Sequence, residues 1–310
     1  MRTVITSERR TRIVLKNVAV IPKALWLANI VRRHRVEHIH AHWAGTSATM
    51  AWLAAKLANL PWSFTAHRWD IDEANALAAK LREASFGRAI SKRGFGQMRK
   101  FASRDNLRVI PMGVAVPASV PKAADSRRLR ILVPANLFVV KGHRYLLQAL
   151  ATLLPNDIVI RCEFAGSGPE LDRLMALSQE LGLENTVSFL GAITQSEVID
   201  RYSRGGVDLV VLPSIVTEEG EQEGIPVALM EAMSFAIPVI STRTGAIPEL
   251  VEGVGLLVPP KDAKALGDAI LSLVDPTARR ELGNLGRNRV SERFDVAVSV
   301  RLLLDAIERC

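Results

Sequence analysis

The sequence predicts an α/β protein of two Rossmann-like domains, each built on a parallel sheet. At 310 residues the chain is long enough to bury two separate cores. Short apolar segments alternate with helical patterns, which favours parallel strands joined by crossover helices. Val114–Arg128 interrupts this alternation with two prolines, four alanines and two serines. We therefore expect domains at 1–122 and 123–310, with the last helix free to pack back on the first domain.

The first domain begins with a helix expected over 23–34, after Pro22. Its apolar face carries Leu25, Leu27, Ala28 and Ile30. We expect this face to pack on the core and not on a membrane surface. The apolar alternation then predicts strands at 36–42, 61–67, 85–91 and 107–113, with helices at 45–59, 72–84 and 92–103 between them.

The second domain repeats the alternation of strands and helices. Its predicted strands lie at 129–137, 157–166, 186–191, 207–214, 238–242 and 255–260. Helices are expected at 142–154, 169–182 and 195–203, after Pro226, and in three segments that lead to Cys310. The same periodicity that predicts the first sheet therefore predicts a second one.

The stretch Glu223–Glu231 reads EGIPVALME and follows the predicted buried strand VDLVVLPS. Open α/β sheets bind ligands at the carboxyl ends of their strands. Pro226 suits a first helical turn, so Glu223 precedes the helix, where unpaired N–H groups attract anions. A phosphate could meet this helix terminus while the two carboxylates hold hydroxyl groups. The alternative is a pair of solvated surface carboxylates.

The segment 212–251, LPSIVTEEGEQEGIPVALMEAMSFAIPVISTRTGAIPELV, closely resembles the signature of glycosyltransferase family 4. It contains a Glu-x7-Glu motif, an EAM helix, a PVI strand and a G-x-x-PELV turn. The resemblance extends from about residue 23 to the end and is strongest over 129–258. It implies the GT-B fold, in which two Rossmann-like domains face each other across a cleft. It also implies retaining transfer from a nucleotide-diphosphate sugar to a glycan or lipid-linked acceptor, in cell-surface polysaccharide or glycolipid synthesis.

The resemblance also implies roles for residues around the donor. Glu223 would position the transferred sugar, Glu231 would bind the ribose hydroxyls, and Lys141, in PANLFVVKGH, would bind the diphosphate. Asn136 stands where the family usually has a second phosphate-binding arginine. The helix terminus and a G-x-G-P turn would complete the donor site with Gly224, Ile225, Pro226, Val227, Gly166 and Gly168. Leu171 occupies the third glycine position of a dinucleotide fingerprint, so an oxidoreductase is excluded at that motif.

Two histidines correspond to family positions in the first domain. His67, in FTAH, is implied to reach the transferred sugar as a catalytic residue, and His42, in HIHAHW, is implied to border the acceptor. His38, His40 and His42 alternate along a strand, but no other metal-ligating residue accompanies them. The sequence also lacks a DxD-type carboxylate pair in a suitable context. We therefore expect a metal-independent protein without a cofactor, with the nucleotide sugar as its donor substrate.

Charge is unevenly distributed between the two domains. Residues 1–122 contain 21 Lys and Arg against 7 Asp and Glu, whereas the remainder contains 19 against 25. A basic half suits an anionic membrane surface or acceptor, or is a merely solvated face. Nucleic acid is not expected, because few aromatic residues accompany the basic ones. Two cysteines and no 18-residue apolar stretch predict a cytoplasmic protein, with peripheral attachment at the inner membrane face left open.

The first domain is shorter than the family pattern, with only about 40 residues before its H-A-H segment. We expect self-association or a partner chain to cover the surface that this leaves. Three interpretations stay open: an active transferase, a nucleotide-sugar-binding subunit that needs a partner chain, and an inactive remnant.

Overall fold

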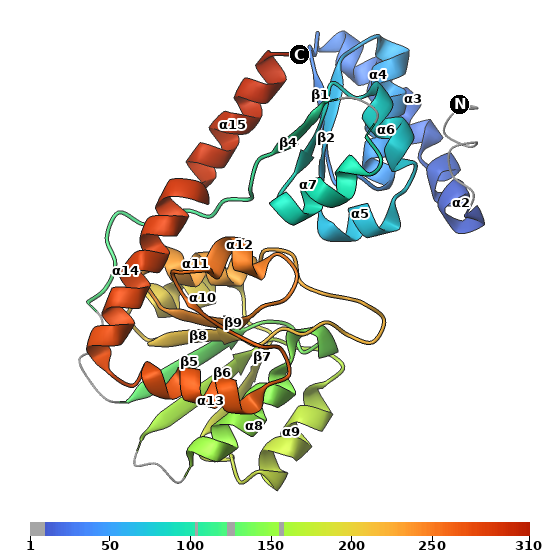
Figure 1. Ribbon diagram of the computed structural model, residues 1–310. Helices are drawn as coiled ribbons and strands as arrows, with labels where there is room; N and C mark the ends of the chain where they lie inside the picture. Colours follow the sequence, from blue (N-terminus) through green and yellow to red (C-terminus); the bar gives the residue numbers. More distant parts are fainter. Residues whose placement is uncertain (1–9, 103–104, 123–127, 155–157) are drawn as a thin grey trace. The chain divides into compact units, whose positions relative to one another are not determined.

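The computed structural model describes residues 10–102, 105–122, 128–154 and 158–310. The chain forms two compact units (Figure 1), one of residues up to Met112 with Ser299–Cys310, the other of Gly113–Val298. The division thus falls ten residues before the expected one. The reason is that the Val114 N–H donates to the Phe294 carbonyl (2.9 Å) and its carbonyl accepts from the Val296 N–H (3.0 Å). These bonds attach the connecting segment to the second unit from its start.

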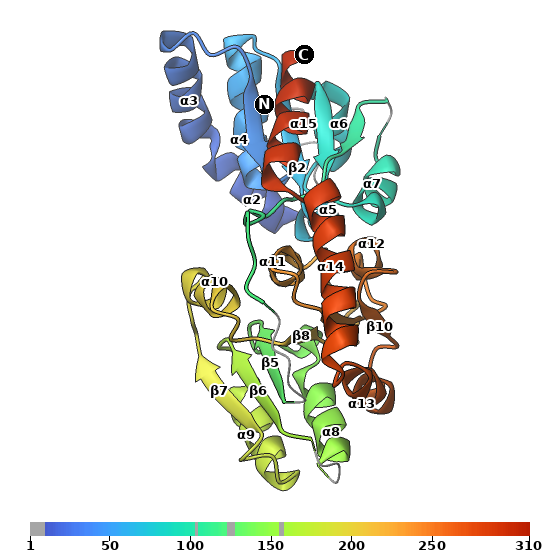
Figure 2. The same cartoon turned by 90° about the vertical axis from the view of Figure 1, so that its left-hand side faces the viewer.

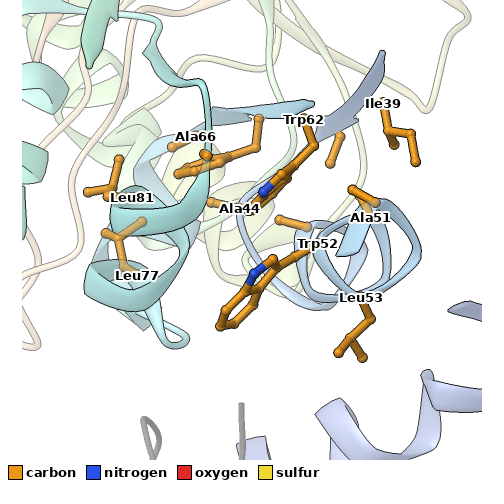
Figure 3. Close-up of a cluster of buried hydrophobic side chains, with 14 of the residues drawn as sticks. Ile39, Ala44, Ala51, Trp52, Leu53, Trp62, Ala66, Leu77 and Leu81 are labelled. Carbon is orange, nitrogen blue, oxygen red and sulfur yellow. The ribbon is translucent and has the colours of Figure 1, made fainter. Parts of the chain in front are cut away.

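The first unit contains a parallel sheet of four strands in sequential order. These are β1 (Ile39–His42), β2 (Trp62–Ala66), β3 (Phe86–Ala89) and β4 (Leu107–Val109). Helix α4 (Thr46–Ala58) packs on this sheet, and Figure 3 shows its Trp52 beside Trp62 of β2, with ring centroids 6.3 Å apart. The four strands lie within the segments predicted from the apolar alternation.

Helices α2 (Thr11–Ala19) and α3 (Ile21–Arg33) precede this sheet and pack against α4. The prediction of which residues of α3 face the core is partly wrong. Ala28 is buried, but Leu25 is exposed and the buried positions beside it are Ala24 and Val31. By length and composition alone, the helical segment Thr11–Arg33 could cross a membrane, and 22% of its apolar 18-residue window is buried. Lys16, Asn17 and Lys23 interrupt its apolar residues, so it contains no uninterrupted apolar stretch of 18 residues.

The single helix expected over 72–84 is instead two helices, α5 (Arg68–Glu73) and α6 (Leu77–Glu83). The break occurs because Ala74 and Ala76 adopt left-handed backbone conformations, with φ of 49° and 47°. Between them lies buried Asn75, whose side chain exchanges hydrogen bonds of 2.9 and 3.1 Å with Asn17 of α2. A buried amide pair therefore overrides the helical pattern. The next helix is α7 (Lys92–Arg99).

The second unit contains a six-stranded parallel sheet in the order β10-β9-β8-β5-β6-β7. Its strands are β5 (Leu129–Pro134), β6 (Ile160–Ala165), β7 (Val187–Gly191), β8 (Leu209–Leu212), β9 (Val239–Thr242) and β10 (Leu256–Val258). Between them come the 3-10 turn η1 (Val139–Lys141) and helices α8 (His143–Leu153), α9 (Leu171–Glu180), α10 (Gln195–Ser203), α11 (Val227–Ser234) and α12 (Ile247–Val251). All six strands fall within or overlap the predicted segments.

The strand order positions the site. From β5 the chain adds β6 and β7 on one side, then returns to place β8 on the other side of β5. Connections therefore leave β5 and β8 in opposite directions, which opens a crevice outside their carboxyl ends.

Three helices end the chain, as predicted: α13 (Ala263–Ser272), α14 (Pro276–Arg293) and α15 (Val296–Glu308). The last turns of α15 belong to the first unit (Figure 2). Ala306 is buried there with Phe86 and Ile110, and Leu303 and Ile307 pack against them.

Candidate functional site

A pocket of about 460 Å³ lies at the carboxyl ends of three neighbouring strands of the second unit. Pro134 ends β5, Ala165 ends β6 and Leu212 ends β8, and all three line it. The pocket therefore occupies the crevice that the strand order creates. We call it the C-terminal pocket.

Most of the residues implicated by sequence at the donor side line this one pocket. They are Asn136, Lys141, Gly166, Glu223, Ile225, Pro226, Val227 and Glu231. Gly168 and Gly224 are not among the lining residues. The structure thus brings together side chains that lie up to 95 positions apart in the sequence.

Helix α11 points its first turn at the C-terminal pocket. Val227 and Ala228, its first two residues, line the pocket, and the N-cap Pro226 makes no side-chain capping bond. The first N–H groups of a helix have no intrahelical acceptor, so this end carries partial positive charge. The helix begins one residue after the proline, which was expected in its first turn.

Lys141 and Glu223 form an ion pair within the pocket. Their side chains are 21% and 15% exposed, so water screens this pair less than a surface pair. Lys141 ends η1, and Glu223 lies in the loop before α11. The cation implicated in phosphate binding therefore touches the carboxylate implicated in sugar binding.

Glu231 is buried on α11, with 8% of its surface exposed. Burial raises the pKa of its carboxyl group, an effect that a hydrogen bond donated by the Gln195 amide opposes. No role was assigned to Gln195 from the sequence. It begins α10 and follows the end of β7 by four residues, in the region from which ligand-facing residues come.

The two glycines of the GSGP turn allow close backbone packing beside the pocket. A Cβ on Gly166 would lie 2.1 Å from the Ala135 carbonyl oxygen, and one on Gly168 would lie 2.4 Å from that of Leu137. The Leu137 N–H also donates to the Ser167 carbonyl at 2.9 Å. These glycines join the turn after β6 to the loop that carries Asn136 and Lys141.

Gly245 supports the Glu223 loop and was not assigned a role from sequence. It has a left-handed φ of 54°, and a Cβ there would lie 1.9 Å from the Glu223 carbonyl oxygen. The Ala246 N–H also donates to that oxygen, at 3.4 Å. The signal was present in the G-x-x-PELV turn, which begins with this residue.

The two implicated histidines of the first unit meet at the carboxyl ends of β1 and β2. The Nε2 atoms of His42 and His67 are 2.9 Å apart, a hydrogen bond that requires one ring to be neutral. Burial, and then the neighbouring His42 and Arg88, lower the pKa of His67 to about 4. Burial, and then Arg88, also lower the pKa of His42. Both rings therefore offer neutral donors and acceptors near pH 7.

The alternating histidines do not converge on a metal position. His38 and His40 bridge to Ser63 at 2.7 Å each, and His40 also reaches Thr65 at 2.9 Å. Within the described ranges, no group of three or more His, Cys, Asp or Glu side chains is arranged to hold a metal ion.

Comparison with known proteins decides the family. The model of the family described as "Glycosyl transferases group 1" matches residues 119–289, which contain the whole C-terminal pocket. The chain belongs to this glycosyltransferase family. Its resemblance to family 4 glycosyltransferases, noted from the Glu-x7-Glu segment, is thereby confirmed.

Two curated relatives of this glycosyltransferase are named for the synthesis of bacterial polysaccharides. WcaL of Escherichia coli, named for colanic acid biosynthesis, is 34% identical over 220 residues, covering 69% of this chain and 54% of WcaL. AmsK of Erwinia amylovora, named for amylovoran biosynthesis, is 33% identical over 210 residues, covering 66% of this chain and 51% of AmsK. The chain thus spans about half the length of these relatives.

Solved glycosyltransferase structures share the fold. HepE of Anabaena, crystallised with UDP, superposes with a TM-score of 0.78 at 20% identity, covering 93% of this chain and 82% of HepE. A Rickettsia africae glycosyltransferase gives a TM-score of 0.74, also at 20% identity, covering 94% of this chain and 81% of that one. The predicted GT-B class with two parallel sheets is confirmed.

Proposed function

We propose that this glycosyltransferase moves a sugar from a nucleotide-diphosphate sugar to a glycan or lipid-linked acceptor, with retention at the anomeric carbon. The C-terminal pocket carries the proposal, because it combines a lysine, an uncapped helix terminus and two carboxylates at the sheet's switch point. A diphosphate needs the first two features, and sugar hydroxyl groups suit the carboxylates. The polysaccharide relatives support a role in cell-surface polysaccharide or glycolipid synthesis.

In the proposed reaction, the bond between the anomeric carbon and the phosphate oxygen breaks while the acceptor oxygen bonds to the same face of the sugar. The acceptor proton passes to an oxygen of the leaving diphosphate. Lys141 and the first N–H groups of α11 stabilise the charge that develops on that diphosphate, which removes the need for a metal ion. Asn136 adds a neutral hydrogen-bond donor.

The Lys141–Glu223 pair gives these two residues linked roles. When the diphosphate takes Lys141 as its partner, the Glu223 carboxylate becomes available to hold the sugar hydroxyl groups. Glu231, which is buried and fixed by Gln195, binds the ribose. In the first unit, His67 hydrogen-bonds the transferred sugar and His42 the acceptor.

The paired glutamates give the test of this proposal. We expect Glu223→Gln to lower turnover strongly without weakening donor binding, because Lys141 is then freed for the diphosphate. Glu231→Gln should mainly weaken binding, because ribose does not change during the reaction. Thermal shift with a panel of nucleotide sugars selects the donor, and calorimetry and transfer or donor-hydrolysis rates are then compared for both variants.

Reversed effects would refute the assigned roles, and two unaffected variants would refute the donor site. Donor binding without transfer would instead favour the nucleotide-sugar-binding subunit or the inactive remnant.

Attachment of a cytoplasmic protein to an anionic membrane surface is also part of the proposal. The segment 10–35 carries seven Lys and Arg and no Asp or Glu. Exposed apolar side chains, Leu15, Val18, Leu25 and Trp26, recur along α2 and α3. Basic residues beside such a stripe suit the surface of an anionic membrane. A second copy or a partner chain remains the alternative cover for the first unit.

A further inference from the structure

Trp43 is an exposed aromatic residue beside His42 and His67 of the first unit. It directly follows β1, and 46% of its surface is exposed. Its ring stacks on His67, with centroids 4.2 Å apart and planes at 24°, and His42 meets it edge-on at 6.3 Å. One face of the indole therefore rests on an imidazole, while the ring keeps a large exposed area.

The backbone of Trp43 is held in an unfavourable conformation. Its φ is 84°, in the left-handed region that bulky side chains rarely adopt. Such strain persists only where the neighbouring structure fixes it, and it concentrates at functional sites. The Trp43 N–H donates to the Thr65 carbonyl at 3.0 Å, and the Ser47 hydroxyl donates to the Trp43 carbonyl at 2.7 Å.

Two charged side chains fix the segment that follows. Asp70 accepts hydrogen bonds from the N–H groups of both Ala44 (2.9 Å) and His67 (3.0 Å), which ties the loops after β1 and β2 together. Lys80 is fully buried and donates to the carbonyls of Ala44 and Gly45 at 2.7 and 2.8 Å. Burying charges is costly, and here both charged groups hold the backbone that directly follows Trp43.

We propose that Trp43 is the stacking platform for a sugar ring of the acceptor, with His42 and His67 bonding hydroxyl groups at its edge. The assignment of this sugar to the acceptor rests on the proposed function, whereas the stacking of a sugar ring on Trp43 does not. A pyranose has an apolar C–H face and a rim of hydroxyl groups, which match an aromatic face bordered by neutral imidazoles. Trp69, the nearby exposed indole, is less suited because the Arg68 guanidinium covers it at 3.9 Å.

The full chain contains five tryptophans, so 5-fluorotryptophan labelling gives a simple ¹⁹F NMR spectrum in which Trp43→Phe assigns the Trp43 signal. We would titrate methyl glycosides of glucose, galactose, mannose, fucose and N-acetylglucosamine. At least one should shift the Trp43 signal saturably and leave that of Trp26, an exposed residue of α3, unchanged. By saturation-transfer NMR, Trp43→Ala should weaken that glycoside roughly three- to tenfold, and Trp43→Phe should retain most binding.

The proposal is overturned if no glycoside moves the Trp43 signal, or if Trp43→Ala binds as the unchanged protein does. A shift of the Trp69 signal alone would also overturn it. Calorimetry with UDP and GDP on the same samples reports the C-terminal pocket, so failure of the donor proposal is seen separately.

Discussion

Glu231 is a buried residue whose charged form lowers the stability of the folded protein. Its carboxyl group is buried beside the neutral Gln195 amide, without a cation in the described contacts of its side chain. Burial raises its pKa, which means that the folded protein disfavours the charged form. Near neutral pH the carboxylate therefore costs folding free energy. We propose that a ligand of the C-terminal pocket needs this carboxylate, which would explain its presence.

We predict that Glu231→Gln stabilises the free protein at pH 7.5 but not at pH 4. The raised pKa means that the stability Glu231 contributes is present below its unfolded value of 4.5 and is lost as pH rises above it. The amide has no such dependence and can still bond Gln195. Urea unfolding of both proteins at the two pH values measures the difference. The prediction is contradicted if the two proteins have equal unfolding free energies at pH 7.5. It is also contradicted if the variant's advantage over the parent is smaller at pH 7.5 than at pH 4.

The loop before α11 is held in place by a backbone contact between Gly245 and the Glu223 carbonyl. Gly245 lets the backbone before α12 approach the Glu223 carbonyl, and the same loop carries the ion pair to Lys141. The position of Glu223 is therefore set from both sides, by a glycine and by a lysine.

Gly245→Ala should lower both stability and turnover, whereas Gly253→Ala should lower stability alone. Both glycines have positive φ, at 54° and 77°, but an alanine Cβ at Gly253 meets no atom within 4 Å. The control should therefore cost about 1 kcal/mol of unfolding free energy, from backbone conformation only. Gly245→Ala adds the clash with Glu223, for about 1–3 kcal/mol more. Equal unfolding free energies and equal turnover in the two variants would show that the contact does not position Glu223.

The sequence predicted the elements of both sheets because the apolar alternation is regular and each strand is buried. It failed at α5 and α6, where the buried Asn75–Asn17 pair lies 58 positions apart and no local pattern reveals it. The pocket could be predicted because strand ends meet at one sheet edge. Gln195 could not, because its contact with Glu231 arises only from tertiary packing. Gly245 begins the recognisable G-x-x-PELV turn, but no local pattern shows that this glycine meets the Glu223 carbonyl.

For the whole molecule, the uneven charge has a testable consequence. Trp26 and Leu25 of α3 are exposed between basic residues, so we expect binding to vesicles that contain phosphatidylglycerol and little binding to pure phosphatidylcholine. Replacing both by Glu should abolish most binding, and raising the salt concentration should weaken it. Leu285→Glu, on an exposed position of α14, is the matched control. Cosedimentation would contradict the proposal if neutral vesicles bound equally or the control lost as much binding.

We propose that the C-terminal pocket binds a nucleoside diphosphate through Lys141 and the α11 terminus without a metal ion. Calorimetry with UDP, GDP, ADP, CDP and dTDP in excess EDTA measures this binding. At least one should bind, and Lys141→Ala should weaken it roughly 10- to 150-fold, the loss of one charge-assisted contact. Lys264→Ala, a lysine on α13 outside the pocket lining, should bind unchanged. Binding that requires added Mg²⁺, or that Lys141→Ala leaves undiminished, would show that Lys141 and the helix terminus do not replace a metal ion.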